Sequence, residues 1–347
     1  MIQNEREPRI LITRLSAFGD CILTLPMACA LRQRFPNALL AWAVEPLSLP
    51  TIKLHSCIDE VVAVPKGWLK SPRAIRRLRH ELRALRLDIV IDPQSLSKSA
   101  TLAWISGAKR RIGFAAPRGR ELAPWLNTEL VTADVRHIVD ASLRLLRPVG
   151  IRTPKVEFQV PIDTSTMAKV ERFLKDAHLG GGFSIVNAGA SWLSKLWPAD
   201  RFGRVARFLG EVHNLPSLIT WAGDDESNRA DVIVAKSGGH AIKSPPTSLL
   251  ELAEFLRRAV IVVSSDTGPL HLAAGTGTPC VGLYGPTRHE ECGPYGKQHI
   301  ALQAQFPSHR NRKLRKTDMA PMLSISEDAV CQACSDILAR HRAHEAA

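Results

Sequence analysis

Residues 262–274 read Val-Val-Ser-Ser-Asp-Thr-Gly-Pro-Leu-His-Leu-Ala-Ala, and they predict a strand, a polar turn and a helix in succession. The strand should run from Ala259 to Val263. Pro269 should open the helix, because the N–H that proline lacks would be unpaired at the first helical position anyway. A second β-like run, residues 279–285, follows just past the helix. The unit is therefore βαβ, which predicts a parallel sheet.

The turn between this strand and helix also predicts an anion site. Free backbone N–H groups and the positive end of the helix dipole would face the space beyond the strand. Asp266, Thr267 and Gly268 would offer backbone and hydroxyl donors to a diphosphate. His271, one turn into the helix, would donate to a phosphate or simply pack. The alternative is an ordinary turn in which Asp266 is the helix N-cap.

The whole chain alternates predicted strands and helices in two series, and this pattern indicates an α/β fold. Residues 150–163 are punctuated by proline and read as a linker between the series. We expect an N-terminal Rossmann-like domain over residues 1–160 and a second over residues 161–325, facing each other across a cleft. The helix expected in residues 326–347 could pack back on the first domain.

Composition favours a folded protein of two domains. The chain has 347 residues, of which 45% are hydrophobic. No apolar run approaches the roughly 20 residues of a membrane span, and the N-terminus lacks the features of a signal peptide. Seven cysteines without a small-domain framework suit a reducing compartment. We therefore expect a soluble cytoplasmic protein. Cys331 and Cys334 lack the second ligand pair that a zinc site would need.

The net charge of +13 predicts an anionic partner. Basic residues cluster in residues 70–86, which predict an amphipathic helix, and again in residues 109–120 and 309–316. Any one of these runs is typical of a solvated surface. Nucleic acid, anionic lipid and a phosphorylated substrate all fit the charge, and a single partner rich in phosphate and carboxylate would account for all three runs together.

Missing motifs argue against three protein classes. No Gly-x-Gly-x-x-Gly follows the first predicted strand, and no Gly-x-x-x-x-Gly-Lys-Ser/Thr occurs in the chain, which disfavours an oxidoreductase and a P-loop kinase. The sequence also has no zinc, helix-turn-helix or aromatic-rich sheet motif of a nucleic-acid-binding protein.

Further motifs occur in order along most of the chain. They are Arg9–Asp20 with Thr24-Leu25-Pro26, Asp92-Pro93-Gln94 with Lys98-Ser99, Ser194-Lys195-Leu196-Trp197-Pro198, Gly223 with Glu226 and Ala230, Tyr284-Gly285-Pro286-Thr287, and Gly293-Pro294-Tyr295-Gly296. Together with residues 262–274, they resemble glycosyltransferase family 9, the bacterial heptosyltransferases that build the inner core of lipopolysaccharide. The resemblance implies a glycosyltransferase-B architecture and inverting transfer of heptose from ADP-heptose to a Kdo-containing acceptor.

The resemblance gives roles to individual residues. Asp20 is the proposed catalytic base of the family, and it follows the first strand, where parallel sheets hold their ligands. The alternative for Asp20 is an N-cap of a helix from Ile22 onward. Lys195 would face the diphosphate as a point charge. Glu226 would accept hydrogen bonds from ribose hydroxyls, unless it is only a solvated residue at a helix start.

The remaining expectations concern the acceptor, metals and partners. Lys98, Ser99, Arg118 and Arg120 would meet an anionic acceptor sugar. No metal or other cofactor is expected, because helix N-termini and Lys195 can replace a cation and no paired-carboxylate motif stands near the diphosphate turn. The expected partners are a nucleotide sugar and an anionic glycolipid, with peripheral contact to an anionic membrane at the inner face of the inner membrane, and no nucleic acid.

Several alternatives stay open at this point. Family members often carry cysteines in the region that corresponds to residues 305–322, whereas this chain has none there, so the acceptor is open. Another nucleotide sugar or glycan would suit the same motifs. The alternatives of another class are a basic nucleic-acid-binding protein and a non-catalytic anion-binding module. Asp20 and Lys195 both argue against the anion-binding module.

Overall fold

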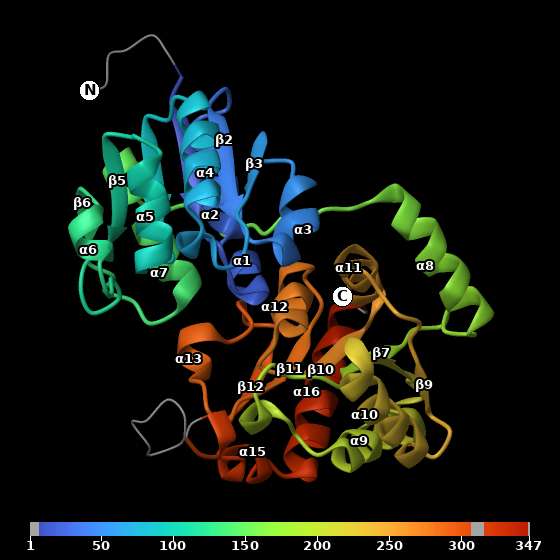
Figure 1. The fold of residues 1–347 in the computed structure, drawn as a ribbon. Helices are drawn as coiled ribbons and strands as arrows, with labels where there is room; N and C mark the ends of the chain where they lie inside the picture. Colours follow the sequence, from blue (N-terminus) through green and yellow to red (C-terminus); the bar gives the residue numbers. More distant parts are fainter. Residues whose placement is uncertain (1–6, 307–315, 346–347) are drawn as a thin grey trace. The chain divides into compact units, whose positions relative to one another are not determined.

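The structure is a computed structural model that describes residues 7–306 and 316–345. The chain divides into two compact units, residues 1–161 and residues 162–347. Each unit contains a six-stranded parallel sheet with helices packed against it (Figure 1). The α/β fold class with two Rossmann-like units is therefore confirmed.

The sheet of unit 1 has the strand order β3-β2-β1-β4-β5-β6, and every neighbouring pair is parallel. Its strands are β1 (Arg9–Thr13), β2 (Leu39–Val44), β3 (Glu60–Ala63), β4 (Ile89–Asp92), β5 (Arg110–Phe114) and β6 (Glu129–Val131). Its helices are α1 (Phe18–Ile22), α2 (Leu25–Arg34), α3 (Leu49–Lys53), α4 (Pro72–Ala84), α5 (Ser97–Ile105), α6 (Ala123–Leu126) and α7 (Ile138–Arg144).

The sheet of unit 2 has the order β12-β11-β10-β7-β8-β9, again parallel throughout. Its strands are β7 (Ser184–Asn187), β8 (Ser217–Thr220), β9 (Ala241–Lys243), β10 (Ile261–Ser265), β11 (Cys280–Leu283) and β12 (Ile300–Leu302). Its helices are α8 (Thr164–Asp176), α9 (Ala199–His213), α10 (Gly223–Lys236), α11 (Leu249–Arg258), α12 (Gly268–Gly275), α13 (His289–Cys292), α15 (Ala320–Leu323) and α16 (Glu327–Glu345).

Central strands are buried along their whole length, as in other parallel sheets that helices cover on both faces. All four residues of β4, of β7 and of β11 are buried. In unit 1, helices α4 and α5 pack their apolar sides onto one face of the sheet, with Leu78, Leu82 and Leu102 in the shared core. Their other sides face outward.

The predicted βαβ unit is confirmed, with small shifts at its ends. β10 and β11 pair in parallel, and α12 connects them. The strand ends at Ser265, two residues later than expected, and the helix begins at Gly268, one residue before Pro269. In unit 1, the helix expected from Ile22 is two helices instead, because Pro26 occupies the first turn of a new helix, α2.

The C-terminal helix α16 belongs to unit 2 by its contacts. It packs against α9, β11 and β12, and Val330, Cys334 and Ile337 are buried in the core of that unit. In the part of the chain that the structure describes, no helix combines the length and the apolar character needed to cross a membrane.

Candidate functional site

Both sheets have a point where the chain leaves two neighbouring strands in opposite directions. In unit 1 these strands are β1 and β4, and in unit 2 they are β7 and β10. Ligands of parallel α/β sheets bind outside the carboxyl ends of the strands at such a point. The segments that follow these four strands carry Asp20, Lys98, Lys195 and Asp266. Four of the predicted site residues therefore lie where each topology favours a ligand.

Asp266 is the centre of a buried polar cluster in unit 2. Its Oδ2 accepts hydrogen bonds from Lys195 Nζ at 2.6 Å and from Thr287 Oγ1 at 2.6 Å. Its Oδ1 lies 3.2 Å from Nε2 of His271. Lys195 also donates to the backbone carbonyl of Asp266 at 3.1 Å. The side chains of Asp266, His271 and Lys195 are only 5%, 8% and 12% exposed.

The surroundings of Asp266 keep its carboxylate ionised. Burial alone would raise the pKa of Asp266, but the hydrogen bond from His271 and the charge of Lys195 outweigh it. The net result is a pKa well below the usual range of an aspartate. A buried carboxylate with such partners fixes their positions. It therefore holds the Lys195 ammonium and the His271 ring in place.

The start of α12 differs from both sequence interpretations of Asp266. Thr267, not Asp266, is the N-cap, so the ordinary capped turn is wrong. The backbone N–H of Asp266 donates to the carbonyl of Leu283 at 3.1 Å, so it is not free for a phosphate as expected. Among the described residues, the backbone N–H groups of Thr267 and Gly268 have no hydrogen-bond partner, and Nδ1 of His271 is buried without one. These groups are therefore available to contact an anion.

The loop that carries Lys195 is fixed by the tryptophan two residues later. Trp197 is fully buried, donates from Nε1 to the carbonyl of Ile325 at 3.1 Å and packs edge-to-face on Phe202. Arg229 of α10 donates to the carbonyl of Trp197 at 2.7 Å. These contacts explain why a lysine in this sequence pattern can be held rigidly on a loop.

A second tryptophan of the same loop lies against two lysines. The ring centre of Trp192 is 5.0 Å from Nζ of Lys195 and 5.1 Å from Nζ of Lys316. Cations over an indole face are attracted by its quadrupole. Sequence alone assigns no role to Trp192 or to Thr287, because neither residue type indicates a site without its tertiary partners.

Glu226 lies in the first turn of α10, next to the loop after β7. Its Oε2 accepts a hydrogen bond from the backbone N–H of Ala222 at 2.8 Å. The carboxylate fits over Gly189, where an added Cβ would lie 2.0 Å from it. Burial raises the pKa of Glu226, against the opposing effects of that hydrogen bond and of Arg229. Glu226 is thus a partly buried acceptor at the carboxyl edge of the sheet.

Asp20 lies inside α1 and is not the N-cap of a helix from Ile22. Its Oδ2 pairs with Nη2 of Arg14 at 2.9 Å and accepts the backbone N–H of Ala17 at 3.3 Å. The Asp20 side chain is 38% exposed, whereas that of Arg14 is 6% exposed. Oδ1 of Asp20 has no hydrogen-bond partner within residues 7–306 and 316–345. One carboxylate oxygen is anchored and the other is available.

Lys98 and Ser99, predicted as a pair, have different roles in the structure. Nζ of Lys98 donates to Ser16 Oγ at 2.6 Å and to Glu45 Oε1 at 2.9 Å, which joins the loops after β1, β2 and β4. Ser99 is fully buried, and its hydroxyl exchanges hydrogen bonds with the backbone of Leu96. The Ser99 hydroxyl serves the start of α5 and cannot meet an acceptor, which corrects that expectation.

Arg118 and Arg120 lie in the segment between β5 and α6. Arg118 donates to the backbone carbonyls of Val135 at 2.9 Å and Arg136 at 2.6 Å, so much of its guanidinium is committed to the fold. Arg120 is exposed, and its guanidinium has no hydrogen-bond or ion-pair partner among the described residues, although its charge acts on the neighbouring Glu121. Most of the third basic run, residues 309–316, lies outside the described residues; only Lys316 lies within them.

Asp92, the first residue of the motif Asp92-Pro93-Gln94, has a structural role. It is fully buried and accepts hydrogen bonds from Ser95 N at 2.9 Å and Asn127 Nδ2 at 3.3 Å. Burial raises the pKa of Asp92, although these hydrogen bonds oppose the rise. A Cβ at Gly113 would overlap Asn127. The motif therefore stabilises the end of β4 beside the site.

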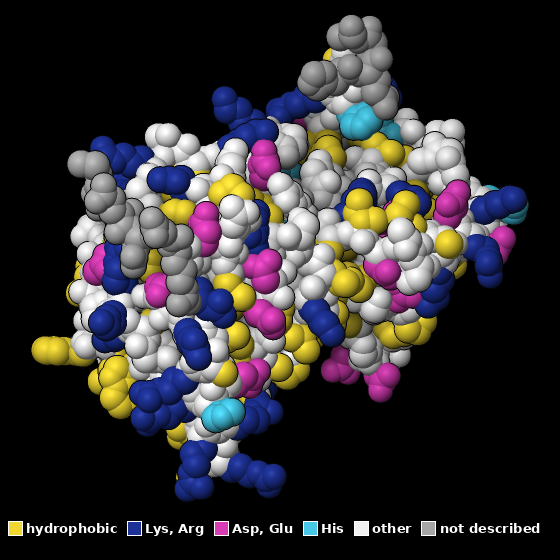
Figure 2. Space-filling view, turned by 90° about the horizontal axis from the view of Figure 1, so that it is seen from above, with side chains coloured by type: hydrophobic (Ala, Val, Ile, Leu, Met, Phe, Trp, Pro, Cys, Tyr) yellow, Lys and Arg dark blue, Asp and Glu magenta, His cyan; other side chains and the backbone are white. Residues whose placement is uncertain are grey.

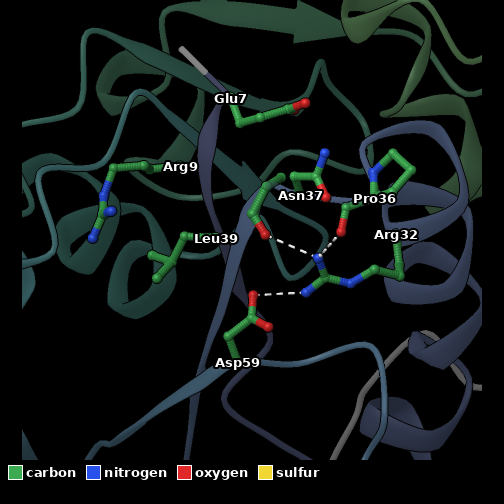
Figure 3. Close-up of a pocket in the computed structure, with 8 residues that line it drawn as sticks. Glu7, Arg9, Arg32, Pro36, Asn37, Leu39 and Asp59 are labelled. Atoms are coloured by element: carbon green, nitrogen blue, oxygen red, sulfur yellow. Dashed lines mark hydrogen bonds and ion pairs between the residues drawn. The ribbon is translucent and has the colours of Figure 1, made fainter.

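Two cavities lie away from these residues, at the amino edges of the sheets. One, of about 510 Å³, is lined by residues such as Arg9 and Leu39, which begin β1 and β2 (Figure 3). Arg32 and Asp59 also line it and form an ion pair of 2.6 Å. The other, of about 740 Å³, lies between α8 and the start of β7. Since ligands bind at the carboxyl edges of such sheets, neither cavity belongs to the site.

No set of metal ligands occurs among the described residues. They contain no group of three or more His, Cys, Asp or Glu side chains arranged to hold a metal ion. All seven cysteines are free, including Cys331 and Cys334 of α16.

Comparison with known proteins identifies the relatives of this chain. The sequence profile described as "Glycosyltransferase family 9 (heptosyltransferase)" matches residues 75–321. Among characterised proteins, lipopolysaccharide heptosyltransferase 1 of Pseudomonas aeruginosa is 27% identical over 308 residues, which cover 86% of this chain and 84% of that protein.

Solved structures agree with the fold. A family 9 glycosyl transferase from Veillonella parvula has a TM-score of 0.80 at 23% identity, with 96% of this chain and 97% of that chain covered. The E. coli heptosyltransferase WaaC with ADP-2-deoxy-2-fluoro heptose has a TM-score of 0.73 at 24% identity, with 94% and 99% covered.

Proposed function

Because the chain belongs to glycosyltransferase family 9, the heptosyltransferases, we propose that it transfers heptose from ADP-heptose to a Kdo-containing inner-core acceptor of lipopolysaccharide, with inversion at the anomeric carbon. The observation that carries the proposal is the cluster in which Asp266 holds Lys195 and His271 beside the start of α12. The name of the Pseudomonas relative supports the acceptor class, and the ligand of the E. coli structure supports the donor.

The diphosphate of the donor lies, in this proposal, against the N–H groups of Thr267 and Gly268. The dipole of α12 favours negative charge there. The Lys195 ammonium neutralises charge on the departing nucleotide, and Nδ1 of His271 supplies a further polar contact. The Asp266 carboxylate would repel a phosphate, so it acts as a positioning residue for Lys195 and His271. This division of roles is typical of sites that stabilise a leaving group electrostatically.

Glu226 accepts hydrogen bonds from the ribose hydroxyls. Its Oε2 is already held by Ala222 N–H, and its carboxylate lies over Gly189 beside the loop after β7. Neutral hydroxyl donors suit a carboxylate in a partly buried setting, because a hydrogen bond offsets the cost of burying the charge.

Asp20 takes the proton of the acceptor hydroxyl through Oδ1, while Arg14 and Ala17 N–H hold Oδ2. The acceptor oxygen forms a bond to the anomeric carbon as the bond to the phosphate oxygen breaks, and the nucleotide leaves with that electron pair. Attack opposite the leaving group inverts the centre. Lys98, Arg118 and Arg120 attract the carboxylates and phosphates of the acceptor, with the unpartnered Arg120 the most available of them.

The proposed reaction needs no metal and no cofactor besides the donor, since Lys195 and the helix terminus supply the positive charge. Turnover that is unchanged by a chelator agrees with this, and turnover that requires added Mg²⁺ contradicts it. The proposed place of action is the cytoplasm, at the inner face of the inner membrane, with an anionic glycolipid and not nucleic acid as the partner.

A thermal-shift panel of ADP, UDP, GDP and NADH tests the donor assignment. A ligand at 100 times its Kd stabilises by about 2.7 kcal/mol, which corresponds to a rise of roughly 5–11 °C in Tm for a unit of this size. We expect ADP to give such a shift and the others to give little. A larger shift with UDP or GDP would indicate another nucleotide sugar. No shift with any nucleotide would favour a non-catalytic anion-binding protein.

A further inference from the structure

The exposed basic and aromatic side chains of α4, α5 and α6 have no role in the proposed reaction. Residues 72–126 contain twelve Lys and Arg against four Asp and Glu, so they carry +8 of the chain's net +13. Only three of the twelve, Lys98, Arg118 and Arg120, have a role in the proposed reaction. In Figure 2, dark-blue basic side chains and yellow hydrophobic ones gather together at the lower left. The charge of this protein is thus concentrated in one segment of unit 1.

The basic side chains of α4 point away from the core. Leu78 and Leu82 bury one side of the helix, and Arg76, Arg79 and Arg83 lie on the other side, where all three are exposed. None of these guanidinium groups has an ion-pair or hydrogen-bond partner among the described residues. Their charges are therefore available to an external anion.

Two exposed tryptophans lie on the neighbouring helices. Trp104, near the end of α5, is 56% exposed, and Trp125, in α6, is 85% exposed. Such exposure is unusual for tryptophan, which is highly buried on average. Leu130, on the adjacent edge strand β6, is 47% exposed as well. These three exposed side chains therefore add apolar area to the outer surface of α5, α6 and β6.

Contacts between the elements bring the two kinds of side chain together. α5 packs between α4 and α6. The Arg83 side chain passes over Gly107, one turn beyond Trp104, and Arg111 donates to the carbonyl of Leu126, the neighbour of Trp125. The ends of all three helices thus meet near the start of β5, where Lys109 is also exposed and its ammonium has no hydrogen-bond or ion-pair partner among the described residues.

Two acidic side chains near this surface are already occupied. Glu129 forms a two-fold ion pair with Arg110 at 2.6 and 2.9 Å, and Glu121 accepts the backbone N–H of Ser97. Glu81 of α4 forms no ion pair among the described residues, so one negative charge lies beside the free charges of Arg79, Arg83 and Lys109. The surface therefore has a net positive charge together with exposed indole rings.

We propose that this surface, formed by Arg79, Arg83, Trp104, Lys109 and Trp125, binds the face of an anionic phospholipid bilayer. Tryptophan prefers the level of the lipid headgroups, where its ring is apolar and its N–H is hydrated. Lys and Arg near an anionic leaflet are each worth about 1 kcal/mol, or about fivefold in affinity. The surface lies at the amino edge of its sheet, whereas Asp20 and Lys98 follow the carboxyl ends of their strands, so binding to lipid leaves the site of unit 1 unobstructed.

Vesicle sedimentation with the full chain tests the proposal. The protein should bind vesicles of phosphatidylethanolamine and phosphatidylglycerol and not vesicles of phosphatidylcholine alone. R79Q/R83Q/K109Q should lose about 100-fold in affinity. W104S/W125S should lose more than about tenfold, because tenfold corresponds to only about 55 Å² of apolar burial. Equal binding to both kinds of vesicle would overturn the proposal.

Matched controls separate this surface from the overall charge. R172Q/K175Q/K236Q removes the same charge from exposed positions of unit 2, and Val212→Ser removes an exposed apolar side chain of α9 that is 62% exposed. Both control variants should bind vesicles nearly as wild type does. An equal loss in the charge control would overturn the proposal, as would a change of oligomeric state in W104S/W125S with vesicle binding retained.

The inference extends the proposed function, because a lipid-borne acceptor is met at a bilayer. Vesicle binding is measured with neither donor nor acceptor present, so its failure leaves the ADP assignment untouched. Conversely, vesicle binding without any nucleotide-induced shift would support the surface and remove the proposed reaction.

Discussion

Replacement of Lys195 by Met should destabilise unit 2 strongly, in addition to any effect on turnover. The Lys195 and Asp266 side chains are 12% and 5% exposed and meet at 2.6 Å, so the pair is buried. Removal of one partner of a buried pair typically costs about 3–5 kcal/mol, because the other charge is left uncompensated. For a unit of this size, that corresponds to a fall of roughly 6–20 °C in Tm.

A second variant distinguishes this cause from a general loss of packing. In Lys195→Met/Asp266→Asn neither charge remains, so much of the lost stability should return, while donor binding stays weak because the ammonium is absent. Arg207→Met is the matched control in the same unit. Arg207 and its partner Glu211 are 56% and 47% exposed, and such exposed pairs are worth about 0–1 kcal/mol.

Urea and thermal denaturation of the four proteins provide the measurement, with ADP binding by calorimetry beside it. A loss of less than about 1 kcal/mol in Lys195→Met would refute the reasoning, since it would mean that Asp266 does not depend on Lys195 for its charge. A double variant no more stable than the single one would refute it as well. The turnover of a Lys195 variant can be interpreted only after correction for the fraction of protein that the loss of stability unfolds.

Three further outcomes follow from the same contacts. The pKa of Asp266 is depressed in the folded protein, so the contribution of this carboxylate to stability is complete above its unfolded pKa, near 4, and is lost as the pH falls through the folded pKa. The difference in stability between wild type and Asp266→Asn should therefore shrink in acid. A difference that grows below about pH 4 would contradict the assignment. Burial raises the pKa of Glu226, so ADP affinity should begin to fall on acidification at a pH above the ordinary range of a glutamate. Glu226→Gln should remove that part of the pH profile. An identical profile in the variant would exclude Glu226 from the ADP site. In Gly189→Ala the new Cβ would displace the flexible end of the Glu226 side chain. Calorimetry should therefore show weaker ADP binding, while the free energy of unfolding changes by less than about 1 kcal/mol. Full ADP affinity in a folded variant would contradict the proposed contact between Glu226 and the ribose.

The sequence predicted the parts of this protein that depend on local pattern. The apolar run before Asp266 and the Pro269 helix start predicted β10, α12 and the parallel pairing with β11, all of which the structure has. Asp20 and Asp266 were predicted to follow strands, and the structure places Lys98 and Lys195 after the neighbouring strands, so parallel topology brings each pair to one sheet edge. Periodicity and strand order suffice for such predictions.

The partners of these residues could not be predicted in the same way. Arg14 lies close to Asp20 in sequence, yet only the path of the loop shows that the two form an ion pair. Thr287 is distant from Asp266 in the chain and reaches it because β11 lies beside β10. Ser99 matched a motif, but its hydroxyl is turned to the helix start and buried. Only the tertiary structure shows which polar groups form contacts within the fold and which are available to a ligand.

The central claim is that this chain uses Asp20 as the base in heptose transfer from ADP-heptose. Incubation of the full chain with ADP-heptose and a Kdo-containing lipid acceptor, with ADP release and product mass followed together, tests it most directly. Wild type should release ADP only when the acceptor is present and add one heptose to it. Asp20→Asn should be about 10²–10⁴-fold slower with unchanged ADP affinity. Acceptor-independent ADP release, or an Asp20→Asn variant as fast as wild type, would contradict the claim.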